Sequence, residues 1–178
     1  GLELMSVCFY VLAGINRKKE KAIEASLKYF LLGAFATGFI VYGIALIYGS
    51  TETTSLEIIT AGFVSFSGNI IFIIGILLFL IGFSFKIAAF PFHMWVPDVY
   101  QGSATTVTGL MSTGGKTAAF SAIIVSLAAL FYDDVINIFQ PYLAVIAVLS
   151  MLYGSIVALA QNDLKRMLAY SSIAHAGY

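Results

Sequence analysis

Long apolar runs separated by short polar segments dominate the chain. A bilayer core of about 30 Å requires roughly 20 apolar residues in a helix. We therefore predict six membrane-spanning helices, with the ranges 1–15, 27–49, 68–90, 104–131, 138–161 and 164–178. The runs are longer than the roughly 9–11 residues of a barrel strand and do not alternate between apolar and polar positions. The pattern predicts an all-α membrane protein, a polytopic transmembrane helix bundle forming a single domain over 1–178.

The polar and proline positions indicate where this pattern is interrupted. Residues 50–67 begin with too many polar side chains to span a bilayer, so we expect a loop with a short interfacial helix. Pro141 is expected in the first turn of its helix, where proline is tolerated. Pro91 removes a backbone donor and clashes with the preceding turn, which predicts a proline-broken third helix. The first and last runs are cut within apolar sequence, so we expect a fragment of a longer membrane protein.

Composition agrees with a lipid environment. Hydrophobic residues make up 60% of the 178 positions and charged residues 10%, against about 25% charged in soluble domains. The formal net charge is zero, so nothing indicates a nucleic-acid partner. One cysteine and two histidines form no cluster of the spacing that holds zinc or haem. No glycine-rich nucleotide motif occurs, so we expect no metal, no cofactor and no redox chemistry in this chain.

The basic residues indicate the orientation of the spans. Seven of the nine fall on one side of the predicted topology: Arg17, Lys18, Lys19, Lys21, Lys28, Lys165 and Arg166. The connections on the other side carry only acidic residues, so the positive-inside rule places the basic loops in the cytoplasm.

Three charged side chains remain inside the predicted spans: Glu3, Lys86 and Lys116. A lysine at mid-membrane costs about 2.5–3.5 kcal/mol unless it is paired or faces water. One interpretation is that the lysines extend towards the headgroups, which suits Lys86 better than the deeper Lys116. The other is a buried proton relay, in which burial disfavours the ammonium form and a nearby carboxylate favours it. A pair between Glu3 and Lys86 would then be a tunable site.

Further polar residues extend the relay hypothesis. Thr105, Thr108, Ser112 and Lys116 follow one another at steps of three and four, which places them on one helical face and predicts a channel lining. The alternative is that the hydroxyls bond back to their own helix. His93 and His175 are possible proton relays, although a membrane histidine is as often a packing residue.

Several segments carry a family resemblance. They are ELMS at 3–6, SLKYFLLGAFATGFIVYGIALIYG at 26–49, FKIAAFPFHMWVPDVYQGSATTVTGLMSTGGKTAAF at 85–120 and NDLKRMLAYSSIAHAGY at 162–178. The chain resembles the antiporter-like membrane subunits of respiratory complex I, the NADH:quinone oxidoreductase, and among them most the bacterial N type. The resemblance implies a fragment of an inverted-repeat, antiporter-like fold of about fourteen helices with discontinuous helices near the ion path.

The resemblance also implies roles for individual residues. Glu3 matches the glutamate of the family's fifth helix, Lys86 the lysine of the discontinuous seventh helix, and Lys116 the central lysine of the eighth helix. The family's lysine in the twelfth helix has no counterpart in this chain. Ala104 and Thr106 stand where the family usually has prolines, and this departure touches none of the relay positions.

The implied function is proton translocation coupled to quinone reduction elsewhere in the complex. The expected partners are other membrane-arm subunits, the lipid bilayer and protons, in a multi-pass protein of the bacterial inner membrane. NADH, flavin, iron–sulfur clusters and quinone are expected on other subunits. Alternatives are a subunit of an Mrp-type cation/proton antiporter, a structural spacer of the membrane arm, and, more weakly, a quinone-binding subunit using His93 and Trp95.

Overall fold

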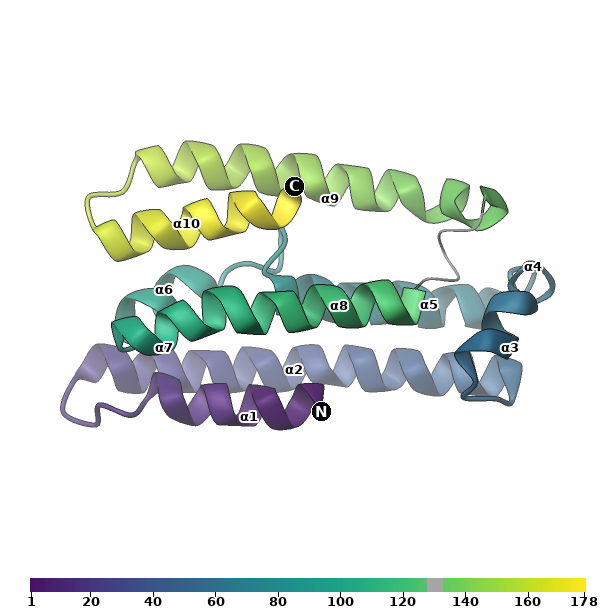
Figure 1. Cartoon of the computed structure of the whole chain (residues 1–178), viewed down its shortest axis with the longest axis horizontal. Coiled ribbons are helices and arrows are strands. Elements are labelled where there is room, and N and C mark those ends of the chain that lie inside the picture. The colour runs from purple at the N-terminus through teal and green to yellow at the C-terminus, as the bar shows by residue number, and fades with distance from the viewer. Residues whose placement is uncertain (128–132) are drawn as a thin grey trace.

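The computed structural model describes residues 1–127 and 133–178, and every described element is a helix. The long helices lie side by side with their axes roughly aligned (Figure 1). Their bounds are α1 (Leu2–Ala13), α2 (Glu20–Thr51), α3 (Leu56–Ala61), α4 (Phe63–Phe66), α5 (Ile70–Ile87), α6 (Val96–Gly102), α7 (Thr105–Leu110), the π-helical turn η1 (Met111–Gly115), α8 (Lys116–Leu127), α9 (Asp133–Leu159) and α10 (Leu164–Gly177). The predicted all-α bundle is confirmed.

Three of the described helices are long and apolar enough to cross a membrane: Glu20–Thr51, Ile70–Ile87 and Phe139–Leu159. The other predicted spans correspond to the shorter α1 and α10 and to the run from α7 to α8. The α1–α2 and α9–α10 connections lie at one end of the bundle, and the short helices α3 and α4 lie at the opposite end (Figure 1). We call the first the basic end, because its connections and their flanks carry the clustered basic residues.

Several helix bounds differ from the predicted ones. Helix α2 begins at Glu20 instead of residue 27, because the polar segment before the apolar run consists of good helix formers. At 32 residues it is longer than a bilayer core, so its first turns extend past the apolar part of the span. Helix α9 begins at Asp133 instead of 138, so Pro141 lies inside it and not in its first turn. Acidic residues suit a first helical turn. The predicted fourth span, 104–131, is described as far as residue 127, and its residues 128–131 lie outside the described residues.

The third span ends earlier than predicted. Helix α5 stops at Ile87, and Ala88 adopts a left-handed conformation with φ of 63°. The N–H groups of Ala88 and Ala89 donate to the carbonyls of Phe85 and Ser84, which closes the helix end. The residue before a proline disfavours helical geometry, so a helix approaching Pro91 ends before it.

Aromatic and polar contacts hold the segment after this break in place. Trp95 stacks on Tyr29, with ring centroids 4.4 Å apart, and its indole N–H donates to the carbonyl of Phe85 at 3.1 Å. The N–H of Phe90 donates to Ser150 Oγ on α9 at 2.9 Å. Helix α6 is thereby fixed beside the end of α5, in contact with α2.

Small residues allow α2 and α5 to approach closely. A Cβ added at Gly43 would lie 2.7 Å from the carbonyl oxygen of Gly75 and 2.8 Å from the backbone nitrogen of Phe79. A Cβ at Gly82 would lie 3.0 Å from the carbonyl oxygen of Ala36. Close packing through small residues is the usual way membrane helices associate. It sets the register that brings Lys86, in the last turn of α5, beside α1.

Candidate functional site

Lys86 and Glu3 form an ion pair across two helices. Lys86 Nζ on α5 lies 2.9 Å from Glu3 Oε1 on α1, and the lysine side chain is 6% exposed. The ammonium also donates to Ser6 Oγ at 2.8 Å. The approach to Oε1 does not meet hydrogen-bond geometry, so the contact is an ion pair by distance and not a well-directed bond. The two residues predicted to form a tunable pair are therefore in contact.

Thr37 on α2 holds the second carboxylate oxygen of Glu3. Its Oγ1 lies 2.8 Å from Glu3 Oε2 and 2.9 Å from the carbonyl oxygen of Gly33. A hydroxyl has one proton to donate, so the two acceptors compete for it. Because Thr37 lies near the middle of α2, this contact places Glu3 near the mid-length of that helix, where the Glu3 side chain is still 45% exposed.

Lys86 and Lys116 line the same small cavity. Its volume is about 10 Å³, and its wall also includes Ser6 and apolar side chains such as Phe9, Trp95 and Met111. A cavity needs roughly 10–15 Å³ of this kind of volume to hold one water molecule. The cavity that both lysine residues line therefore has room for a single water at most.

Lys116 occupies an unusual position in the chain. It begins α8 directly after the π-helical turn Met111–Gly115, and its side-chain amine Nζ donates to the backbone carbonyl of Ser172 on α10. The ion pairs among the described residues do not include Lys116. Single π-helical turns within α-helices often occur at functional sites. The turn therefore marks the point at which this lysine meets both the cavity and α10.

The predicted lining residues meet a groove beside Lys116. Thr105, Thr108 and Ser112 line an open groove of about 460 Å³ between α7, η1 and α10. Its other residues are Tyr100, Gly109, Lys165, Leu168, Ser171, Ser172 and His175. The groove includes Lys165, near the start of α10, and Ser172, whose carbonyl accepts from Lys116. It therefore runs from the basic end of α10 towards the second lysine.

Two hydroxyls of this groove, those of Thr108 and Ser112, are also bonded to backbone. Thr108 donates towards the carbonyls of Tyr100 and Ala104, and Ser112 donates to Gly109 at 3.0 Å. His175 Nδ1 lies 2.7 Å from the carbonyl oxygen of Ser171. The alternative of hydroxyls bonding to their own helix is thus realised for Ser112 and in part for Thr108, while both still line the groove.

Two further predicted positions, His93 and Pro91, lie apart from the cavity that Lys86 and Lys116 line. His93 is stacked against Phe90 and Tyr153, and its buried Nδ1 has no hydrogen-bond partner among the described residues. Pro91 lies in the irregular segment between α5 and α6, after the left-handed Ala88. Neither residue belongs to the wall that contains Lys86 and Lys116.

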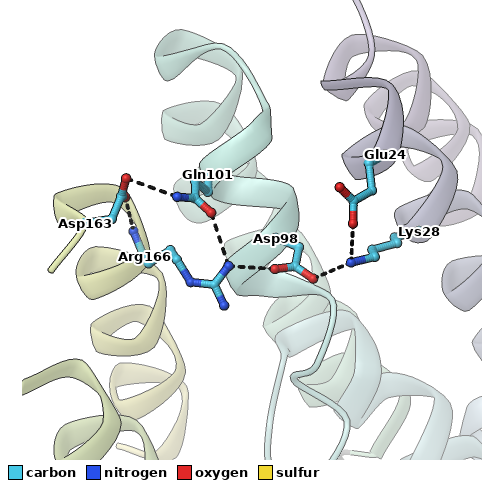
Figure 2. A network of polar contacts seen from close by, with 6 residues as sticks. All are labelled: Glu24, Lys28, Asp98, Gln101, Asp163 and Arg166. Carbon is cyan, nitrogen blue, oxygen red and sulfur yellow. Dashed lines mark hydrogen bonds and ion pairs between the residues drawn. The ribbon is translucent and has the colours of Figure 1, made fainter. Parts of the chain in front are cut away.

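A polar network at the basic end was not predicted from the sequence. Asp98 on α6 contacts Lys28 Nζ of α2 at 2.7 Å and Arg166 of α10 at 2.7 Å (Figure 2). We call this set the basic-end network, and its members are Glu24, Lys28, Asp98, Gln101, Asp163 and Arg166. It joins three helices that are far apart in the sequence, and one carboxylate serves two cations.

Asp163 completes the network at the start of α10. It caps this helix by accepting from the backbone N–H of Arg166 at 2.9 Å, and it accepts from Gln101 Nε2 at 3.0 Å. These two donors hold the pKa of Asp163 below its usual value. An ionised carboxylate at a helix N-terminus is favoured by the helix dipole as well.

Sequence reasoning missed Ser6, Thr37, Ser172 and the basic-end network. Ser6 stands three residues after Glu3, a spacing that places both on one helical face, so a local signal existed. Thr37 and Ser172 had no such signal, because each meets its partner only through helix packing. Within residues 1–127 and 133–178, no group of three or more His, Cys, Asp or Glu side chains is arranged to hold a metal ion.

Known proteins resemble the whole chain. The family model described as NADH:quinone oxidoreductase/Mrp antiporter, transmembrane, matches residues 1–178. The NADH-quinone oxidoreductase subunit N of Salinibacter ruber is 54% identical over 179 residues, covering 100% of this chain and 35% of the relative. This chain thus spans about a third of the length of that relative.

Solved structures agree with this result. A chain of respiratory complex I from Thermus thermophilus is 41% identical with a TM-score of 0.80, covering 99% of this chain and 37% of the other. A chain of the Mrp complex from Dietzia sp. DQ12-45-1b is 25% identical with a TM-score of 0.88, covering 99% of this chain and 33% of the other. The predicted resemblance is confirmed by these matches.

Proposed function

The chain belongs to the NADH:quinone oxidoreductase/Mrp antiporter transmembrane family, and on that premise we propose that it forms part of a proton-translocating subunit of a bacterial NADH:quinone oxidoreductase. One observation supports this most directly. Two lysines from different helices line one cavity of about 10 Å³, and a carboxylate is paired with one of them. Titratable groups that line one cavity, within helices of a membrane protein, favour proton transfer over a purely structural role.

The proposed transfer begins with Lys86 as an ammonium paired with the Glu3 carboxylate. When Glu3 moves away or is neutralised, Lys86 loses the charge that favours its protonated form. Lys86 then gives a proton to a water in the shared cavity, and that water gives a proton to Lys116 as a neutral amine. Lys86 ends neutral, Lys116 ends as an ammonium, and the carbonyl of Ser172 accepts a hydrogen bond from the new charge.

The groove beside α10 is the proposed path between Lys116 and the basic end. Its hydroxyls and His175 can exchange protons with water that enters near Lys165. Moving one charge against a potential of about 100 mV costs about 2.3 kcal/mol. In this proposal, quinone reduction elsewhere in the complex supplies that free energy.

The wider setting belongs to the same proposal. We place the protein in the bacterial inner membrane as a multi-pass subunit, in contact with other membrane-arm subunits. NADH, flavin, iron–sulfur clusters and quinone are assigned to other subunits of the complex. The chain spans 35% of the length of the Salinibacter ruber relative, so further parts of the proton path are expected in the rest of the protein.

The test uses the full-length protein in its complex. Lys86→Met and Lys116→Met are introduced separately, and NADH-driven proton uptake into inside-out vesicles is measured by quenching of a pH-sensitive dye. We expect both variants to assemble and to lose pumping, whereas Lys21→Met, on the exposed surface of α2, keeps it. Full pumping by either relay variant contradicts the proposal. Failure of both to assemble favours a structural spacer.

The second candidate is a subunit of an Mrp-type cation/proton antiporter, which the likeness to the Dietzia structure supports. It would use the same lysines. Purification of the full-length protein distinguishes the two, because only the first candidate predicts co-purification with iron–sulfur subunits. Na⁺-driven proton movement in vesicles without NADH would favour the second.

A further inference from the structure

An open groove of about 540 Å³ runs between α1 and α2 on the outside of the bundle. Its walls are mainly apolar, and it ends at the loop joining the two helices. The lining residues are Tyr10, Val11, Gly14, Arg17, Ile23, Ser26, Leu27 and Phe30. Four of them expose large apolar side chains, with fractions from 50% at Phe30 to 68% at Val11. This groove shares no lining residue with the cavity of Lys86 and Lys116 or with the groove beside α10. It has only the helices α1 and α2 in common with the proposed relay.

The mouth of this groove is strongly cationic. Arg17 lines it, and Lys18, Lys19 and Lys21 follow within four residues, with Glu20 the one acidic residue among them. All of these side chains are exposed. The ion pairs among the described residues use Lys28, Lys86 and Arg166, so these four basic side chains are not engaged by them.

We propose that this groove binds an anionic phospholipid. The phosphate lies against Arg17 and the neighbouring lysines, and an acyl chain lies along Val11, Leu27 and Phe30. The apolar wall belongs to the short apolar helix α1 and to α2, which is long and apolar enough to cross a membrane, and the cations lie in the loop between them and at the start of α2. A phospholipid has the same order of groups, a charged phosphate followed by an apolar chain.

Charge complementarity decides between the possible occupants. A neighbouring protein helix would fill the apolar wall but would leave the cationic loop uncompensated. Free phosphate would satisfy the cations but would leave the apolar wall exposed to lipid in any case. Basic clusters immediately cytoplasmic of a transmembrane helix attract anionic lipids, with an effect of about fivefold in binding for each Lys or Arg near the surface.

The inference does not depend on proton transfer, since it concerns residues outside the relay. It bears on the relay only through α1, the helix that also presents Glu3 and Ser6. Its failure would therefore leave the proposed function untouched, and failure of the proposed function would leave the lipid site untouched.

The experiment uses the full-length protein in its purified complex in detergent. The probe is phosphatidylglycerol with a photoreactive diazirine in one acyl chain, and the labelled peptides are identified by mass spectrometry. We expect labelling within residues 10–30, displaced by unlabelled phosphatidylglycerol at a concentration at least about tenfold lower than that of phosphatidylcholine. The joint variant Arg17→Gln, Lys18→Gln, Lys19→Gln should abolish that preference.

A second variant tests the apolar wall without changing the charge. Leu27→Trp places a large ring in the groove and should reduce labelling of residues 10–30. Val41→Trp is the matched control, because Val41 is 57% exposed on the same helix, close to the 56% of Leu27, and does not line the groove. This control should leave the labelling unchanged.

Three results would overturn the proposal. The first is equal displacement by phosphatidylglycerol and phosphatidylcholine, and the second is equal displacement by inorganic phosphate. The third is absence of lipid labelling while a photoreactive amino acid at position 27 crosslinks to another protein segment, which would assign the groove to a protein neighbour.

Discussion

Lys86 and Lys116 line one cavity, although they belong to different helices and are held by different partners. Lys86 contacts a carboxylate and a hydroxyl on α1, and Lys116 contacts a backbone carbonyl on α10. The first amine therefore has a full counter-charge and the second has a dipole. A proton shared between them responds to any movement of Glu3, because removing the carboxylate changes the environment of Lys86 far more than that of Lys116.

The cavity itself can be tested without changing either lysine. A Cβ at Gly115 would lie 3.0 Å from Phe9 Cε2, and both residues line the cavity. Gly115→Ala should therefore remove the space for a bridging water and reduce proton pumping on the order of tenfold, equivalent to about 1.4 kcal/mol in the barrier. Dye-quench assays on vesicles containing the full-length protein measure this.

The adjacent glycine provides the matched control. A Cβ at Gly114 meets only Leu110 Cδ1, at 3.6 Å, which is ordinary contact. Gly114→Ala changes the same π-helical turn by one methyl group but leaves the cavity open. If both variants pump equally well, the cavity is not on the proton path.

The α2–α5 contact gives a prediction about stability. Gly43→Ala would place its Cβ against the backbone of Gly75 and Phe79, which cannot move without shifting α5. Overpacking of this kind costs about 1–3 kcal/mol, so the melting temperature of the purified full-length protein should fall. Gly38→Ala is the control, because nothing lies within 4 Å of its Cβ and alanine is the better helix former. Equal melting temperatures for the two variants would refute the close packing.

Local composition was sufficient to predict part of this structure. The spans and the basic end follow from runs of apolar and charged residues, which act through transfer free energy and do not depend on which helices are neighbours. Lys86 and Lys116 could be singled out for the same reason, as charges within apolar runs. The break near Pro91 was also predictable, although its position at Ile87 depends on the left-handed Ala88.

The contacts that organise the site were not predictable in this way. Thr37 meets Glu3, and Ser172 meets Lys116, only because the packing of α1, α2, α8 and α10 sets their relative heights. The π-helical turn before Lys116 has no clear signal in sequence beyond two adjacent glycines. Asp98 lies in the first turn of the short helix α6, and its two cationic partners are 70 and 68 positions away in the sequence.

Lys28 has two acidic partners in the basic-end network, Glu24 and Asp98. We expect neutralising them one at a time to lower the free energy of unfolding by unequal amounts. Asp98→Asn removes the charge that serves both Lys28 and Arg166, and hydrogen bonds to charged groups contribute about 1.5–3 kcal/mol. With Asp98 33% exposed, we expect a loss at the lower end of that range. Glu24→Gln breaks only an exposed pair within α2, which contributes about 0.3–0.5 kcal/mol.

Thermal unfolding of the full-length variants measures both losses. A double-mutant cycle between Asp98→Asn and Arg166→Gln should give a coupling free energy of about 0.5–3 kcal/mol. A loss for Asp98→Asn no larger than that for Glu24→Gln would show that the network does not join the three helices energetically.

Asp163 predicts how stability at the start of α10 depends on pH. Its pKa is held below the ordinary value by the backbone N–H of Arg166 and by Gln101, so the folded protein favours the ionised form more than the unfolded chain does. The resulting stabilisation is complete above the unfolded value of about 3.9 and is lost as the pH falls through the lower folded value. Asp163→Asn keeps an oxygen that can cap the helix but carries no charge.

The melting temperature of the wild type should therefore exceed that of Asp163→Asn by a constant margin from about pH 7 to pH 5 and by a shrinking margin below about pH 4. Glu57→Gln, at the opposite end of the bundle, controls for acid effects on the assay, and a margin that widens in acid would contradict the assignment.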